Sequence, residues 1–410
     1  MFRLRLGVTL AALALSPSAL AQSNDAPVTA ATRPLEATAA QPPGPAAPAA
    51  GEVTASGRAS LTLSGYVESF WQWNFNAPGN GVTAWRGFDN RHNTFSISNA
   101  VVDAAWRYRA VQGRLALQVG LTPDTYYRAE PSRAVIPGAG ISDGDLWKYI
   151  QQASVGLRVP RVDGLFVEAG IFLSPAGPES MTVRDNWNWS RSNLFYGLPY
   201  YHTGLRATYA PSDRHAVAFM LSNGWNSVVD NNDAKSVMAQ YTFTPSSETI
   251  VNVLYFGGIE RGDSDPAGPG WRNLIDAYAR ARVSRRVSLM AHLNAGFEDT
   301  RAGMLSWFGF ALYGRFDLTR SMRLALRADV LYEDSPNERF RLFFPTDVMA
   351  SQTVTYEWAP VDHLLMRVEY RHDVSTDRVF YGASSAAGAS PPIANSFAQD
   401  TLTLGATAWF

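Results

Sequence analysis

Charged side chains that alternate with apolar ones are the residues of this sequence most able to act on a solute. Arg367, Glu369 and Arg371 alternate with Met366, Val368 and Tyr370, and Arg327 and Asp329 show the same spacing. Since successive side chains of a β-strand point to opposite faces, this spacing predicts one charged face and one apolar face. A guanidinium stays charged at any accessible pH, so such a row would act on ions through its electric field and not by proton transfer.

If the apolar face contacts lipid, the charged face has to enclose a lumen. An arginine placed in lipid near the midplane would cost roughly 2–4 kcal/mol. We expect a basic wall opposite carboxylates, which would create a transverse field; the alternative is a set of structural ion pairs that holds the wall round. This wall is expected to contain Arg280, Arg327, Arg367 and Arg371. The candidate lumen residues are Glu68, Asp103, Arg107, Glu168, Arg206, Asp276, Arg280, Arg282, Arg323, Arg327, Asp329, Arg367, Glu369 and Arg371.

The segment of residues 174–199 is rich in Trp, Asn and Arg, which is unusual for a freely solvated loop. We expect it to fold inward and narrow the pore; the alternative is a loop packed across the extracellular mouth, because loops usually lie on surfaces. The residues expected near the constriction are Arg184, Asp185 and Arg191. Trp187 and Trp189 would suit stacking on sugar rings, a weaker hypothesis because aromatic residues are common near membrane interfaces.

The sequence gives little support for a catalytic site or a metal site. The chain has no cysteine, which excludes thiolate catalysis, disulfides and Cys-ligated metals. Its six histidines, at positions 92, 202, 215, 292, 363 and 372, show no spacing typical of a metalloprotease. A set of Ser192, His202 and Asn193 would suit an outer-membrane phospholipase, but a triad is recognised by geometry and not by proximity in sequence. We expect no enzyme activity, no cofactor and no bound metal.

The elements that must position these residues are strands. From about residue 61 onward the chain alternates with period two, most clearly at the end, where Leu402 and Leu404 alternate with Thr401 and Thr403. The segments have the roughly 9–11 residues that a tilted membrane strand needs. About sixteen strands are predicted, within a range of about 14 to 18, an even number being usual for such barrels. Their centres lie near residues 67, 101, 119, 154, 169, 206, 219, 240, 254, 279, 291, 311, 327, 355, 367 and 405.

Connections of two lengths alternate along the chain. Tight turns are expected near residues 111–113, 160–164, 210–213, 245–247, 284–286, 319–321 and 359–362, and long loops at 76–92, 127–147, 175–200, 260–271, 334–347 and 373–397. Short periplasmic turns and long extracellular loops are typical of outer-membrane barrels, and they place both chain ends in the periplasm. An aromatic girdle is expected beside the tight turns, formed by Tyr108, Tyr209, Phe243, Phe316, Trp358 and Phe410.

The N-terminal region differs from the rest of the chain. Residues 1–21 have the basic start, short apolar stretch and small-residue cleavage site of a secretory signal peptide. Residues 22–57 are mainly Ala, Pro, Thr and Gln, a composition that predicts a disordered periplasmic linker. The barrel is expected over residues 58–410. With 35 basic and 36 acidic residues, the chain lacks the basic excess of a nucleic-acid-binding protein.

Several segments resemble a known family. Residues 400–410, ending in Phe410, are similar to the C-terminal signature by which outer-membrane barrels are recognised for assembly. Residues 65–70, 74–76, 86–95, 185–193 and 221–226 resemble segments of the OmpL-like beta-barrel porins. This resemblance, which spans residues 60–410, implies an outer-membrane barrel of a Gram-negative bacterium with pore activity.

We therefore expect an all-β, transmembrane antiparallel barrel that lets small hydrophilic solutes diffuse passively across the outer membrane. The alternatives are a barrel with a closed lumen that serves as a surface anchor or receptor, and a membrane-embedded lipid hydrolase. Expected partners are outer-membrane lipid, the barrel assembly machinery through the C-terminal strand, and a second copy in a homo-oligomer.

Overall fold

The computed structural model describes residues 52–55, 59–130, 144–384 and 393–410. The expected signal peptide and most of the expected linker lie outside the described residues. Within the linker segment, β1 (Glu52–Ala55) pairs with the start of the first long strand. No helix in the described ranges is long and apolar enough to cross a membrane.

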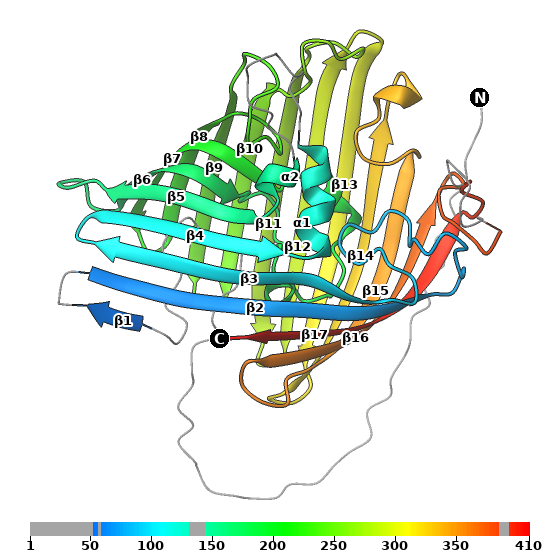
Figure 1. Ribbon diagram of the computed structural model, residues 1–410, viewed down its shortest axis with the longest axis horizontal. Helices are drawn as coiled ribbons and strands as arrows, with labels where there is room; N and C mark the ends of the chain where they lie inside the picture. Colours follow the sequence, from blue (N-terminus) through cyan, green and yellow to red (C-terminus); the bar gives the residue numbers. More distant parts are fainter. Residues whose placement is uncertain (1–51, 56–58, 131–143, 385–392) are drawn as a thin grey trace, which may run out of the picture. The chain divides into compact units, whose positions relative to one another are not determined.

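Sixteen antiparallel strands form a closed barrel within residues 37–410. Each strand pairs with the next, and β17 pairs with β2, beside which it lies in Figure 1. The prediction of sixteen strands is confirmed, and every predicted centre falls inside a strand. The strands are β2 (Ala59–Asn74), β3 (Phe95–Tyr108), β4 (Val111–Val119), β5 (Ile150–Arg158), β6 (Leu165–Leu173), β7 (Tyr201–Ser212), β8 (His215–Ser222), β9 (Ser236–Ser246), β10 (Thr249–Ile259), β11 (Trp271–Ser284), β12 (Val287–Thr300), β13 (Gly303–Asp317), β14 (Met322–Asp334), β15 (Val348–Trp358), β16 (Leu364–Ser375) and β17 (Ala398–Trp409).

The connections differ between the two ends of the barrel. At one end, the short-turn end, the turns are residues 109–110, 159–164, 213–214, 247–248, 285–286, 318–321 and 359–363. At the other end, the long-loop end, the connections are residues 75–94, 120–149, 174–200, 223–235, 260–270, 335–347 and 376–397, with 301–302 as a tight hairpin. The helices lie in these loops: α1 (Leu121–Tyr126), η2 (Tyr127–Ala129), α2 (Gly144–Trp147), η3 (Val183–Asp185), η4 (Asn193–Gly197) and η5 (Glu338–Phe340).

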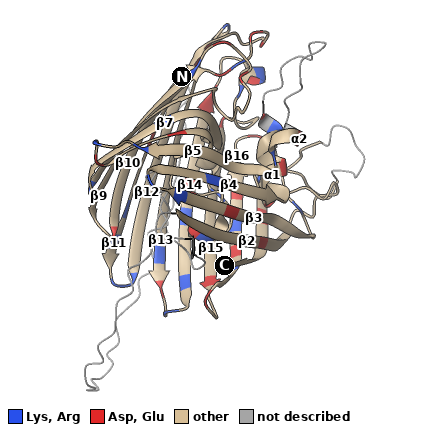
Figure 2. Ribbon diagram, turned by 60° about the vertical axis from the view of Figure 1, so that its left-hand side comes forward, with Lys and Arg blue, Asp and Glu red and all other residues tan. Residues whose placement is uncertain are grey.

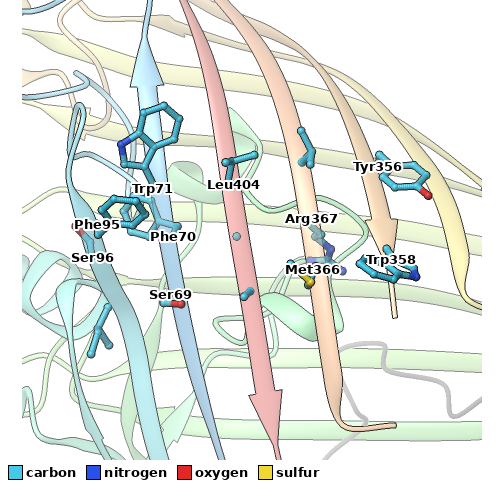
Figure 3. A pocket seen from close by; sticks show the side chains of 14 residues that line it. Ser69, Phe70, Trp71, Phe95, Ser96, Tyr356, Trp358, Met366, Arg367 and Leu404 are labelled. Carbon is cyan, nitrogen blue, oxygen red and sulfur yellow. The ribbon is translucent and has the colours of Figure 1, made fainter. Parts of the chain in front are cut away.

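The alternation of the strands separates an apolar outer face from the interior. On β17, Leu404 is exposed while Thr403 is buried, and on β16 Val368 is exposed while Arg367 and Glu369 are buried. The outer face carries a shallow groove of about 580 Å³ across β3, β2, β17, β16 and β15, lined mainly by apolar and aromatic side chains (Figure 3). An outer face of this kind is what contact with lipid requires.

A cluster of apolar side chains lies in the long-loop half of the interior. Inward-facing side chains of the strands, such as Phe256 and Trp307, pack there against residues of the inward loops, such as Leu198 and Phe344. Trp307 and Phe343 meet edge to face with their ring centroids 5.2 Å apart. The interior is therefore not a uniformly polar channel, and it differs between its two ends.

Candidate functional site

The loop of residues 174–200 lies inside the barrel and is anchored to opposite parts of its wall. The Val183 amide donates to Oε1 of Glu68 on β2 at 2.5 Å, and the Asn193 amide donates to Oδ1 of Asp329 on β14 at 2.8 Å. Near its start, the Gly177 amide donates to Asp276 on β11 at 2.9 Å. Hydrogen bonds from amides to carboxylates are stronger than neutral ones, so these contacts fix the path of the loop.

Carboxylates of the wall thus accept hydrogen bonds from the loop backbone. Glu369 on β16 accepts from the Trp189 amide at 2.5 Å and from the Ser190 amide at 2.9 Å, which uses both oxygens. Thr355 Oγ1 donates to the same carboxylate at 2.7 Å and accepts from Asn188 Nδ2 at 2.7 Å. The apex of the loop is therefore held against β15 and β16.

Three arginines of the wall bind the carbonyl groups of the same loop. Arg367 donates to the carbonyls of Val183, at 2.7 Å, and of Asn186 and Asn188. Arg327 donates to the Ser190 carbonyl at 2.5 Å, and Arg371 to the Arg191 carbonyl at 2.5 Å. We call the residues that hold the loop from β14 and β16 the loop clamp; they are Arg327, Asp329, Arg367, Glu369 and Arg371.

The clamp arginines are also paired with carboxylates and are sealed from solvent. Arg327 pairs with Asp329 at 3.0 Å and with Glu179 of the loop at 3.1 Å. The pairs Arg367–Glu357, at 2.6 Å, and Arg371–Asp373, at 2.7 Å, follow the same pattern. The side chains of these arginines are at most 2% exposed. This geometry favours the alternative of structural ion pairs for the three arginines.

The residues expected at the constriction occupy two environments. The Arg184 and Asp185 side chains remain 29% and 23% exposed on the loop, and Arg184 lies over the Trp409 ring at 5.3 Å. Arg191 is instead buried, donates to the Ser180 and Trp189 carbonyls, and lies over the Phe88 ring at 5.0 Å. Of the three residues, Arg184 and Asp185 are therefore partly exposed and Arg191 is buried.

Three further expected arginines lie at the short-turn end, whereas Arg206 pairs with Glu168 at 2.7 Å within β7 and β6. Arg280 and Arg282 on β11 and Arg323 on β14 are partly exposed. They lie close to Arg315 and Asp317 of β13, two residues that the sequence analysis did not single out. Alternation could have found both, because Phe316 was assigned to the outer face and its neighbours must then point inward. The expected wall of four arginines is thus divided between the clamp and this end.

A second inward loop, residues 75–94, reinforces the long-loop half. Arg86 pairs with Asp89 and reaches Asp373 on β16 at 3.1 Å. Gln72 on β2 donates to Asp89 at 3.1 Å. Burial disfavours ionisation of Asp89, but the positive charge of Arg86 outweighs it and lowers the pKa of this carboxyl group.

The structure does not bring Ser192 and His202, considered above for lipid hydrolysis, into a hydrogen-bonded pair. His202 Nε2 lies 3.1 Å from Ser174 Oγ, and its Nδ1 lies 3.1 Å from the Gly224 carbonyl. Ser192 Oγ donates to Glu179 at 2.5 Å. His202 and Ser192 therefore have different partners. In the part of the chain that the structure describes, no group of His, Asp and Glu side chains is arranged to hold a metal ion.

The last residue lies on the outer face at the junction that closes the barrel. Phe410 is 58% exposed, its amide donates to the Gly65 carbonyl at 3.0 Å, and the Gly65 amide donates back at 3.3 Å. A Cβ at Gly65 would stand 2.7 Å from the Phe410 ring, so a glycine is needed for this close approach. The site thus joins the final aromatic residue to the first barrel strand.

Comparisons with known proteins agree with this architecture. Among solved structures, the outer membrane channel DcaP of Acinetobacter baumannii is similar with a TM-score of 0.55 and 11% identity, over 87% of this chain and 99% of that chain. The anion-selective porin from Comamonas acidovorans has a TM-score of 0.56 and 10% identity, over 86% and 100%. OmpF of Salmonella typhi, in a complex with daunomycin, has a TM-score of 0.56 and 10% identity, over 88% and 100%.

These identities establish a shared fold and no more. A comparison with curated protein sequences found no match. The family described as beta-barrel porin-2, OmpL-like, matches residues 60–410, which is nearly the whole barrel. The chain therefore belongs to the beta-barrel porin-2, OmpL-like family and is an outer-membrane β-barrel.

Proposed function

We propose that the protein is a passive-diffusion channel for small hydrophilic solutes whose free cross-section is set by the loop of residues 174–200. The observation that carries this proposal is the anchoring of the loop on inward-facing charges of β2, β11, β14 and β16. A loop fixed in this way narrows the lumen without moving, because its backbone amides and carbonyls are bound to the wall.

The expected lining residues take two roles in this proposal. Arg280, Arg282 and Arg323 face the aqueous part of the lumen, and Arg184 and Asp185 border the constriction. The clamp residues hold the loop and act on solutes only through its position. Arg191 braces the loop from within. Because the clamp charges are buried and paired, their field is largely cancelled at the constriction.

A barrel with a closed lumen, acting as a surface anchor or receptor, is the second candidate. The apolar core in the long-loop half favours it, since packed side chains such as Phe256 and Trp307 leave little room for water. Planar-bilayer recordings of the purified protein in KCl separate the two candidates. Discrete conductance steps are expected for the channel, and a silent bilayer with correctly folded protein would refute it.

We also propose that Phe410 is part of the signal for barrel assembly. Phe410 lies at the junction where the last strand, β17, pairs with the first barrel strand, β2. Loss of its ring would remove the contact with Gly65 at this junction. Deletion of Phe410 is expected to reduce the heat-modifiable form in the outer membrane. Deletion with unchanged heat-modifiable protein would remove this role. A homo-oligomer also remains a proposal, and chemical cross-linking of intact membranes tests it.

A further inference from the structure

Three arginines share one carboxylate at the short-turn end of the lumen. Asp317 at the end of β13 lies 3.4 Å from Arg282, 3.6 Å from Arg315 and 3.5 Å from Arg323. The three guanidinium groups come from β11, β13 and β14, and their side chains are 19%, 20% and 29% exposed. They are therefore brought together by the sheet and are still reachable from solvent.

Other carboxylates nearby do not balance this charge. Glu357 lies 2.5 Å from Arg323, but its second oxygen is bound to Arg367 of the loop clamp at 2.6 Å. Glu248 reaches Arg282 only at 3.8 Å and is 48% exposed, so solvent screens it. Basic residues also stand out at the short-turn ends of β11 and β13 in Figure 2.

The ion pairs within the cluster are long. Nε of Arg315 and Oδ1 of Asp317 face each other at 3.6 Å without a hydrogen bond, and Arg282 donates to Oδ2 of Asp317 at 3.4 Å. An oxyanion that accepts from the partly exposed guanidinium groups would add shorter charged hydrogen bonds to this cluster. On its other side Arg315 lies over the ring of Trp187 at 5.4 Å, which holds the guanidinium in place from the loop.

We propose that this cluster, defined as Arg282, Arg315, Arg323 and Asp317, binds small oxyanions that carry two negative charges, such as sulfate, hydrogen phosphate or a short dicarboxylate. Guanidinium groups match the paired oxygens of such anions and bind them through two parallel hydrogen bonds. Two negative charges match the excess of positive charge better than the single charge of chloride. This inference rests on the proposed channel function and names the class of solute that it would favour.

The position of the cluster distinguishes a dissolved anion from a lipid headgroup. Arg315 and Asp317 have the same parity on β13 as Ala311 and Tyr313, which face the interior and are buried. Lipid surrounds the opposite, apolar face of the same strand. A dissolved anion reaches the cluster through the lumen, whereas a phosphate on a lipid would have to pass around the rim.

Calorimetric titration of the purified, detergent-solubilised protein with sodium sulfate at low ionic strength tests the site. The double variant Arg315→Gln/Arg323→Gln is expected to weaken sulfate binding about tenfold or more, because it removes two charged hydrogen-bond donors. The matched control is Arg214→Gln, which removes an exposed charge from the β7–β8 turn at the same end of the barrel. Its sulfate affinity should equal that of the parent.

A second variant and a separate conductance measurement complete the test. If Arg315→Gln/Arg323→Gln does not give the heat-modifiable form, Arg282→Gln replaces it and is expected to weaken sulfate binding severalfold. Equal affinities in parent and variant, or binding of short-chain phosphatidylglycerol but not sulfate, would overturn the proposal. Bilayer conductance is recorded separately: a protein that binds sulfate but never conducts refutes the channel alone, and one that conducts without binding sulfate refutes the anion site alone.

Discussion

Two arginines on one carboxylate show how differently neighbouring parts of the lumen wall are built. Glu357 binds both Arg367 and Arg323, at 2.6 and 2.5 Å. The Arg367 side chain is 2% exposed and its donors also bind loop carbonyls, whereas Arg323 is 29% exposed beside the shared carboxylate Asp317. The same residue type on the same interior surface is thus buried where the loop binds it and partly exposed beside the short turns.

The largest expected effect comes from breaking the covered member of this pair. Arg367→Met leaves Glu357 with the partly exposed Arg323 and removes the Arg367 donors from the Asn186 and Asn188 carbonyls, and a loss of about 3–5 kcal/mol in stability is expected. Thermal unfolding of the purified barrel measures it. Arg323→Met is the matched control on the same carboxylate and is expected to cost about 1 kcal/mol or less, because the pair is partly exposed. Equal losses of stability in the two variants would show that burial beneath the loop does not strengthen the Arg367–Glu357 pair.

A second variant tests the contact of the loop apex with the wall. A Cβ at Gly405 on β17 would stand 2.2 Å from the ring of Trp189, so Gly405→Ala has to displace the loop. Overpacking of this kind costs roughly 1–3 kcal/mol, and a changed single-channel conductance is expected as well. In Gly314→Ala the nearest atom is 3.3 Å away on Phe316, and this control should keep the parent conductance.

Neutralising the exposed arginines should change selectivity with little change in stability. Arg315→Gln/Arg323→Gln is expected to shift the reversal potential in a KCl gradient toward cation preference. The shift should be largest in dilute salt, because the Debye length falls from about 30 Å at 0.01 M to about 10 Å at 0.1 M. An unchanged reversal potential, in a variant that still conducts, would place the selectivity elsewhere in the lumen.

The smallest expected effect concerns pH and the second inward loop. The lowered pKa of Asp89 means that its pairing with Arg86 contributes stability above the ordinary aspartate pKa of about 3.9, and that this contribution is lost as pH falls through the lowered value. The parent is therefore expected to lose melting temperature more steeply than Asp89→Asn below about pH 4. If the melting temperatures of the parent and of Asp89→Asn fall equally steeply in this pH range, the Arg86–Asp89 pair does not stabilise the loop.

The sequence by itself determined the barrel. Alternation and turn chemistry are local, so they placed every strand, put Arg327, Arg367 and Arg371 on the interior face, and set Leu404 on the outer one. The same rule also directs Arg315 and Asp317 inward, because they flank Phe316, a residue of the expected aromatic girdle. The resemblance of residues 60–410 pointed to the family that the comparison then established.

Only the tertiary structure decided which interior charges meet the loop and which meet water. The amide of Trp189 binds Glu369 across 180 positions of sequence, and that of Asn193 binds Asp329 across 136. No local pattern encodes such pairs, because their members are far apart in sequence and meet only in the closed barrel. Strand parity is a property of neighbouring residues, whereas burial of a charge depends on whatever distant segment comes to lie on it.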